Sequence, residues 1–226
     1  HLDKFNLSYS NRSDEYHGLS IAGPNSRKVL EKIVRDDVSN EKFKFRDSRR
    51  MFVGGVPAII NRISFTGELG YEIYVAPHYQ LKLYEELMEA GKEFNIKPFG
   101  GRALMSMRLE KNWGAWTLDY RPDFTAKETG LDAFINWDKE FIGKESAQKE
   151  NSSNKLVPLI VETNEIDVTN NEAVLNGDQS IGYVTSGGFA HFVNKSVAFT
   201  FVDQKNIKSE NKIQVEINGD LFNCSI

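Results

Sequence analysis

The feature that most constrains the fold is a change of hydrophobic pattern at the polar stretch 150–154. Before it, strand-like alternation and helix-like spacing of apolar residues occur in turn. After it, short alternating runs lie between turn residues such as Asn176-Gly177-Asp178. The stretch itself has no apolar residue, which is typical of a linker. The sequence therefore predicts an α+β domain over 1–149 and a small antiparallel β-barrel or sandwich over 155–226.

Within the first domain, turn residues and periodicity indicate where the elements lie. Residues 16–34 predict a strand, a turn and a helix, and 50–63 predict two strands around the Gly54-Gly55 turn. A strand over 71–76 precedes an amphipathic helix that starts near Tyr79. A second helix is expected after Gly100-Gly101, and a short one within 142–149.

Charge and composition exclude several classes of partner. The 226 residues carry a net charge of −4 with acidic and basic residues interspersed, so no basic block offers a nucleic-acid footprint. No apolar run approaches the roughly 20 residues of a membrane span. The single cysteine, Cys224, cannot form an internal disulfide, which favours a reducing, cytoplasmic location. The chain begins at His1 without a methionine, and we expect the native N-terminus to lie upstream.

One segment with possible chemistry is Thr66-Gly67-Glu68-Leu69-Gly70-Tyr71-Glu72. Its glycines permit a tight loop, and alternation places Glu72 on the same face as Tyr74, opposite Tyr71. A carboxylate at a strand start can accept two N–H bonds from an amino-pyrimidinone edge. The alternative is a hairpin loop with two solvated glutamates, which is the commoner use of such residues.

Three further segments are weaker candidates. The helix after Gly100-Gly101 carries Arg108, which could clamp a carboxylate or pair with a nearby acid as a surface residue. Thr185-Ser186-Gly187-Gly188 suggests a phosphate nest, but a barrel hairpin or inter-domain loop fits better. Six aromatic residues could line a flat pocket or, more often, form core: Trp113, Trp116, Tyr120, Phe124, Phe134 and Trp137. The four histidines have no metal-ligand spacing, and no GxSxG or GxGxxG motif occurs.

Five segments taken in order carry a more specific pattern: LxIAGPxSRxVL, TGELGYEIYV, GGRALMSMRLEKNWGAW, ETGLDAFINWDKEFIGKESA and GYVTSGGF…KSVAF. This order resembles the aminomethyltransferase (glycine-cleavage T-protein) family throughout, most clearly over 16–202. The third and fourth segments are most similar to the folate-binding portion of dimethylglycine and sarcosine dehydrogenase-like proteins. A related branch with a KGCYxGQ motif is excluded because the corresponding stretch has no cysteine.

The resemblance implies an α+β module with a ferredoxin-like α/β sandwich lobe, a C-terminal β-barrel and a central folate channel. It implies that tetrahydrofolate is held by a glutamate that matches Glu72 and contacted by an arginine that matches Arg108. A family tyrosine falls on Phe65, which keeps the ring and loses the hydroxyl. Trp137 matches an aromatic position near the channel, and Tyr71 is a further expected contact. The family's catalytic aspartate is expected upstream, so no catalytic residue is assigned to this chain.

The implied activity is folate-dependent aminomethyl transfer, which gives 5,10-methylenetetrahydrofolate from a methylated-amine or aminomethyl donor. The implied partners are a flavin oxidase domain or an aminomethyl carrier protein, with FAD bound only by a separate domain or subunit. Two alternatives stay open: a non-catalytic folate-binding or scaffolding module, and a folate-dependent demethylase on the same scaffold.

Overall fold

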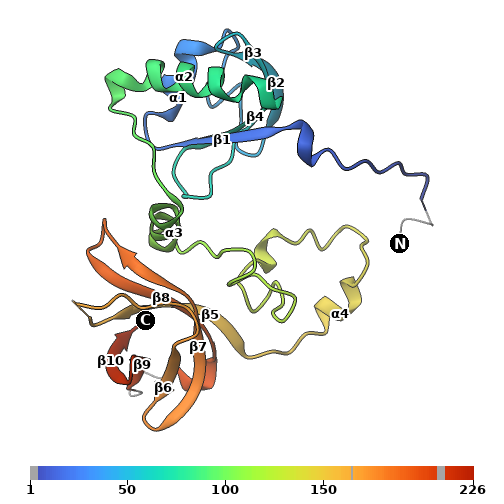
Figure 1. Ribbon diagram of the computed structural model, residues 1–226. Helices are drawn as coiled ribbons and strands as arrows, with labels where there is room; N and C mark the ends of the chain where they lie inside the picture. Colours follow the sequence, from blue (N-terminus) through green and yellow to red (C-terminus); the bar gives the residue numbers. More distant parts are fainter. Residues whose placement is uncertain (1–4, 164, 208–211) are drawn as a thin grey trace. The chain divides into compact units, whose positions relative to one another are not determined.

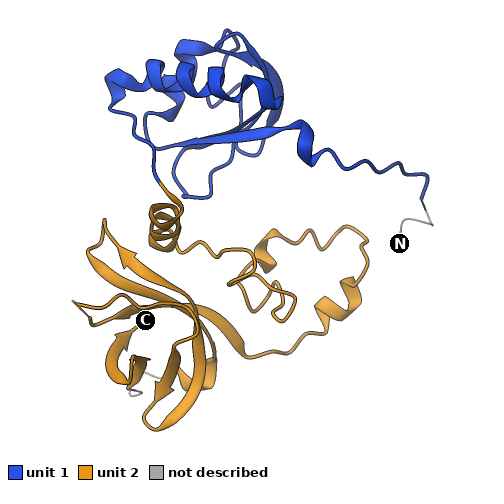
Figure 2. Ribbon diagram, in the orientation of Figure 1, with its two compact units in different colours: residues 1–99 blue, residues 100–226 orange. Residues whose placement is uncertain are grey.

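The computed structural model describes residues 5–163, 165–207 and 212–226. The chain forms two compact units, unit 1 over His1–Phe99 and unit 2 over Gly100–Ile226 (Figure 2). The domain boundary expected from the linker at 150–154 therefore falls inside unit 2. The boundary differs because a helix and a long irregular segment before the linker, within residues 100–149, pack with the strands that follow it.

Unit 1 is an antiparallel four-stranded sheet with two helices on one face (Figure 1). The strand order is β1-β4-β3-β2. Its strands and helices are β1 (His17–Ala22), α1 (Ser26–Ile33), β2 (Ser48–Val53), β3 (Val56–Asn61), β4 (Gly70–Val75) and α2 (Gln80–Gly91). Short 3₁₀ turns occupy Ser13–Glu15, Pro77–Tyr79 and Lys92–Phe94. The strands and helices that the sequence predicts for this region are confirmed.

The core of unit 1 lies between the helices and one face of the sheet. Tyr71, Ile73 and Val75 point into it from β4, and fully buried Leu30 and Leu83 meet them from α1 and α2. Residues 72 and 74 of the same strand lie on the opposite face and stay partly exposed. The alternation therefore separates the core from an uncovered sheet face.

Unit 2 is a closed six-stranded antiparallel barrel preceded by α3 (Gly101–Glu110) and α4 (Lys144–Gln148). A 3₁₀ turn at Asp132–Phe134 lies between these helices, and another at Gln204–Asn206 follows β8. The barrel strands are β5 (Asn154–Val161), β6 (Ala173–Asn176), β7 (Gln179–Ala190), β8 (Lys195–Asp203), β9 (Ile213–Ile217) and β10 (Asp220–Ser225), in the closed order β10-β5-β8-β7-β6-β9. The expected fold class, an α+β domain followed by a small antiparallel barrel, is confirmed.

The barrel hairpin expected around Gly187-Gly188 is confirmed, because β7 and β8 pair antiparallel. Both glycines lie within β7, which continues to Ala190, and not in a loop. Gly187 pairs with Ala198 of β8, and Gly188 pairs with Val197. A Cβ atom at Gly187 would lie 2.6 Å from the carbonyl oxygen of Val168. The glycine is therefore required by a second backbone that crosses the strand closely.

We expect Leu83→Ala to lower the free energy of unfolding of unit 1 by about 2–5 kcal/mol, because it removes a fully buried side chain from a packed core. Leu81→Ala on the same helix is the matched control, since that side chain is 67% exposed. Urea denaturation followed by far-ultraviolet circular dichroism measures both. Equal losses for the two variants would contradict the assigned core.

Candidate functional site

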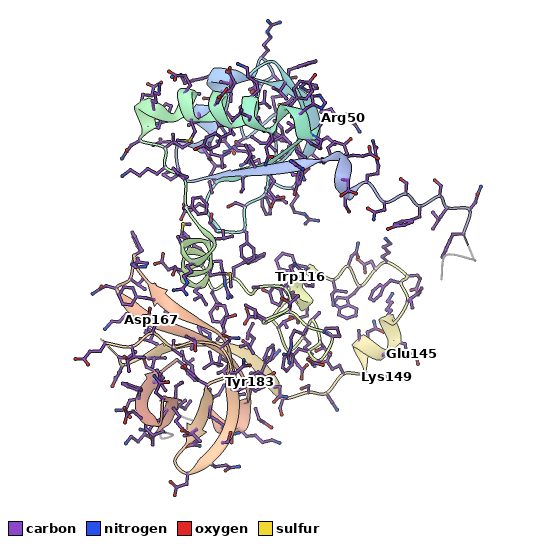
Figure 3. The ribbon with its side chains drawn as sticks, viewed as in Figure 1. Arg50, Trp116, Glu145, Lys149, Asp167 and Tyr183 are labelled. Carbon is purple, nitrogen blue, oxygen red and sulfur yellow. The ribbon has the colours of Figure 1, made fainter. Side chains whose placement is uncertain are left out.

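The uncovered face of the unit 1 sheet brings together side chains from four strands. Cross-strand pairing forms two rows on this face: Ser20, Glu72, Asn61 and Ser48 in one, and Gly18, Tyr74, Ile59 and Arg50 in the other. Arg50, labelled at the right of unit 1 in Figure 3, lies on β2, an edge strand of this sheet. The candidate carboxylate therefore lies on a central strand, with polar neighbours on both sides.

Glu72 is oriented by its own strand. The hydroxyl of Tyr74, two residues on, donates a 2.7 Å hydrogen bond to Glu72 Oε2. An ionised carboxylate has about four acceptor positions, so this bond leaves most of them available. Glu72 is partly exposed and accessible to a ligand with N–H groups.

The loop before β4 is held by its own hydroxyls and by the start of α1. Ser64 and Thr66 share a hydrogen bond of 2.7 Å, and the hydroxyl of Ser26 donates to the carbonyl of Leu69 at 2.9 Å. Phe65 within this loop is partly exposed. Its ring can therefore reach a ligand surface.

The contact predicted for Tyr71 does not fit its position. The side chain has no exposed area, stacks on Phe43 with ring centroids 5.8 Å apart, and accepts a hydrogen bond from Arg27 Nε. Strand alternation turns it away from Glu72 and into the core. Tyr71 therefore packs in the core, on the face of β4 opposite Glu72.

Unit 1 has one cavity near β1 and its helices and another that borders the Glu72 face, and neither is lined by Glu72. One of about 580 Å³ lies along β1 and the end of α2 and is lined by Leu19, Phe94 and Ile96 among others. The other, of about 460 Å³, is bordered by Tyr74 and Ile59. Binding pockets bury most of their ligand, so a ligand at Glu72 needs a further wall over this face.

In unit 2 the predicted arginine is the centre of a buried polar cluster. Arg108 is 1% exposed, and its Nη1 donates to Asp119 Oδ2 at 2.8 Å and to the carbonyl of Trp113 at 3.1 Å. Asp119 has no exposed side-chain area and also accepts from the amide of Ala115 at 2.8 Å. The hydroxyls of Thr185 and Ser186 on β7 complete its shell.

The environment of Arg108 is that of a structural ion pair. Burial lowers the pKa of Arg108 from its ordinary value, and the charge of Asp119 acts in the opposite direction. Its Nε has no hydrogen-bond partner among the described residues. The guanidinium also lies 5.4 Å over the ring of Phe199. A freely accessible carboxylate clamp does not match this burial. The alternative of an arginine paired with a nearby acid fits in its pairing, but the pair is buried and not at the surface.

A cavity of about 880 Å³ adjoins this cluster, between α3, β7 and residues 167–170. Its lining includes Arg102, Arg108 and His191. Arg102 is exposed, whereas Arg108 presents almost no surface. The accessible positive charge at this cavity is therefore that of Arg102.

The aromatic residues expected to form core are mostly at the surface. Trp116, which is labelled in Figure 3, is 74% exposed and Phe134 is 69% exposed. Phe124 is an exception, since its ring stacks on Phe201 of β8. Trp137 is 37% exposed, lies 6.1 Å from the ring of Phe141 and lines a cavity of about 610 Å³.

Sequence reasoning missed two residues that organise these sites, Asp119 and Tyr74. Strand alternation already placed Tyr74 beside Glu72 and could have identified their hydrogen bond. Nothing near Asp119 in the sequence indicates its partners on β7. Among the described residues no group of histidine, cysteine or acidic side chains is arranged to hold a metal ion. In the same part of the chain no helix is long and apolar enough to cross a membrane.

We expect Arg108→Met to lower the free energy of unfolding of unit 2 by about 3–5 kcal/mol, because it leaves the charge of Asp119 buried without its partner. Trp113, Trp116 and Trp137 all belong to unit 2, so tryptophan fluorescence in urea reports on it. Arg102→Met, at an exposed position of the same helix, is the control and should change little. A similarly small effect at Arg108 would contradict the structural ion pair.

The bond to Glu72 predicts an unusual titration of Tyr74. The hydrogen bond to Glu72, then burial and the negative charge of Glu72, raise the pKa of Tyr74 to about 12. A free tyrosine titrates near 10, so the stabilisation from this bond is complete below about pH 10 and is lost as pH rises through about 12. Glu72→Gln should move the pKa of Tyr74 back towards its ordinary value.

Ultraviolet absorbance of tyrosinate measures this titration, read immediately after a pH jump, before alkaline unfolding. The difference between the wild-type and Tyr74→Phe curves isolates the one tyrosine. If that difference curve has its midpoint near 10 in the wild type, the bond to Glu72 does not persist in solution.

Two family models together match most of the chain. The GCVT N-terminal domain matches residues 1–139, and the glycine cleavage T-protein C-terminal barrel domain matches residues 154–226. Mitochondrial dimethylglycine dehydrogenase of Mus musculus is 34% identical over 98% of this chain and 26% of its own length. Aminomethyltransferase of Thermoanaerobacter pseudethanolicus is 32% identical over 95% of this chain and 59% of its own length.

A solved structure has the same fold. The glycine cleavage system aminomethyltransferase T from Bartonella henselae superposes with a TM-score of 0.79 at 23% identity, covering 93% of this chain and 58% of that chain. The chain thus spans about a quarter of the dehydrogenase and somewhat more than half of the aminomethyltransferases it matches. On the combined match to both family models, the chain belongs to the glycine cleavage T-protein (GCVT) family.

Proposed function

We propose that the chain is a tetrahydrofolate-binding module for one-carbon transfer, which gives 5,10-methylenetetrahydrofolate from a methylated-amine or aminomethyl donor. The observation that carries the proposal is Glu72, a partly exposed and oriented carboxylate on the uncovered sheet face of a GCVT-family chain. The names of the relatives support it, since they include aminomethyltransferases and dimethylglycine dehydrogenases.

The acceptor oxygens of Glu72 fit the pterin ring of a folate. The 2-amino and adjacent ring N–H groups of that ring need two neighbouring acceptors, which a carboxylate provides. Phe65, in the loop before β4, is proposed to supply a ring surface beside Glu72. A contact from Trp137 stays a prediction of the family resemblance. Arg108 and Tyr71 are proposed to stabilise their own units and not to contact the folate directly, because their side chains are 1% and 0% exposed.

Bound tetrahydrofolate would supply the nitrogens that accept the one-carbon unit. The role of this chain's residues is to hold and orient the ring. No residue of the chain is proposed as the acid–base group. A flavin oxidase domain or an aminomethyl carrier protein is the proposed source of the donor, and any FAD is proposed to bind outside this chain. The cytoplasmic location expected from the single cysteine stays a prediction.

A non-catalytic folate-binding module is the second candidate. Phe65 favours it, because the position lacks the hydroxyl that the resemblance leads one to expect there. Both candidates require the same ligand site. They differ in whether the full-length protein forms a product.

We expect Glu72→Gln to weaken tetrahydrofolate binding about tenfold or more, because the charged acceptor pair is lost and one acceptor oxygen becomes an amide NH₂ donor. Isothermal titration of the full-length protein measures the change. Glu85→Gln on α2 is the matched control and should bind as the wild type does. Unchanged affinity in Glu72→Gln would refute the assigned site.

Formation of 5,10-methylenetetrahydrofolate from dimethylglycine, sarcosine or an aminomethyl carrier separates the two candidates. The transfer function predicts product with at least one of these donors in the full-length wild-type protein, and a lower rate in Glu72→Gln. Tight folate binding without product from any donor would favour the binding module. Formation of 5-methyltetrahydrofolate from a methyl ether or sulfonium donor alone would instead indicate the demethylase, because that reaction transfers a methyl group without oxidising it.

A further inference from the structure

The Tyr74 ring packs closely against Gly18 on the neighbouring strand. Gly18 of β1 lies directly opposite Tyr74 of β4. A Cβ atom built on Gly18 would lie 3.0 Å from Cε1 and 3.3 Å from Cδ1 of the Tyr74 ring. The ring edge therefore rests against the bare backbone of β1, and a Cβ at position 18 would require the ring to shift by a few tenths of an ångström.

With the ring packed against Gly18, the Tyr74 hydroxyl lies within hydrogen-bond distance of one oxygen of the Glu72 carboxylate. The hydroxyl donates to Glu72 Oε2 at 2.7 Å, and no hydrogen bond to Glu72 Oε1 from any other described side chain accompanies it. Ser20 and Asn61 flank Glu72 across the strands without a hydrogen bond to it in the described contacts. The orientation of this carboxylate thus depends on a single donor.

We propose that Gly18 and Tyr74 form a positioning device that fixes Glu72 so that its free acceptor positions meet two adjacent N–H groups of a ligand. The inference rests on the proposed function, because Glu72 is its acting residue. Tyr74 and Gly18 act through Glu72 and are positioning residues. A carboxylate held in one rotamer loses less side-chain entropy on binding than a mobile one. Holding Glu72 in its bound orientation should therefore raise the affinity for the ligand.

The Tyr74 hydroxyl keeps its proton at ordinary pH. Glu72 keeps the pKa of Tyr74 near 12, so the hydroxyl retains its proton wherever folate binding is measured. Deprotonation of Tyr74 therefore does not break its hydrogen bond to Glu72 at ordinary pH. Ligand discrimination, and not pH dependence, is the property that the positioning device should control.

The test compares two ligands on the full-length protein: tetrahydrofolate and its 2-desamino analogue, which lacks one of the two N–H donors. We expect Tyr74→Phe to weaken tetrahydrofolate binding about three- to tenfold, the effect of one lost hydrogen bond, and to affect the analogue much less. The wild-type preference for tetrahydrofolate should therefore shrink. Tyr84→Phe on α2 is the matched control and should leave both affinities unchanged.

Gly18→Ala tests the packing of the Tyr74 ring against β1 independently. We expect it to weaken tetrahydrofolate binding in the same direction, because the new methyl group displaces the Tyr74 ring. In the double variant with Tyr74→Phe, the two losses should not add, since both act through the same hydroxyl. Additive losses would overturn the role of Gly18.

The outcomes separate this inference from the proposed function. Loss of binding in Glu72→Gln with full affinity and discrimination in Tyr74→Phe would overturn the positioning device alone. An equal loss for both ligands in Tyr74→Phe would also overturn it, because a general structural role would act on both. Unchanged binding in Glu72→Gln would remove the proposed site itself.

Discussion

The buried ion pair between Arg108 and Asp119 is the interaction on which the organisation of unit 2 depends. Asp119 has no exposed side-chain area and accepts hydrogen bonds from α3, from the segment after it and from two hydroxyls on β7. A charge without these donors would be expensive to bury. The cluster therefore fixes an otherwise irregular segment against a barrel strand, which hydrophobic packing of mostly exposed aromatic residues does not do.

The uncovered sheet face of unit 1 is formed by strand alternation and not by a buried ion pair. Its helices cover one side of the sheet, and strand alternation then presents Glu72 and Tyr74 on the other. An open face allows a polar ligand to approach, but it does not bury that ligand. A binding site there needs additional walls. This requirement agrees with relatives that are much longer than the chain described here.

Much of the fold could be predicted from the sequence because the decisive patterns are local. The alternation in β4, the spacing in α2 and the polar linker each lie within about ten residues. The role of Arg108 could not, because its partner Asp119 is satisfied by hydroxyls 66 and 67 residues further along the chain. The same holds for Gly187, whose need for close approach comes from Val168. The place of Glu72 followed from alternation, whereas its ligand comes only from family resemblance and remains a proposal.

The cluster around Asp119 also bears on how the chain can be divided. The two family models meet between residues 139 and 154, yet Thr185 and Ser186 lie on the barrel side and Asp119 on the other. A recombinant fragment cut at the linker would contain the carboxylate but not the hydroxyls that solvate it. Homology boundaries and folding boundaries thus differ in this protein. An expressible barrel fragment should begin before α3, at the junction between the two compact units.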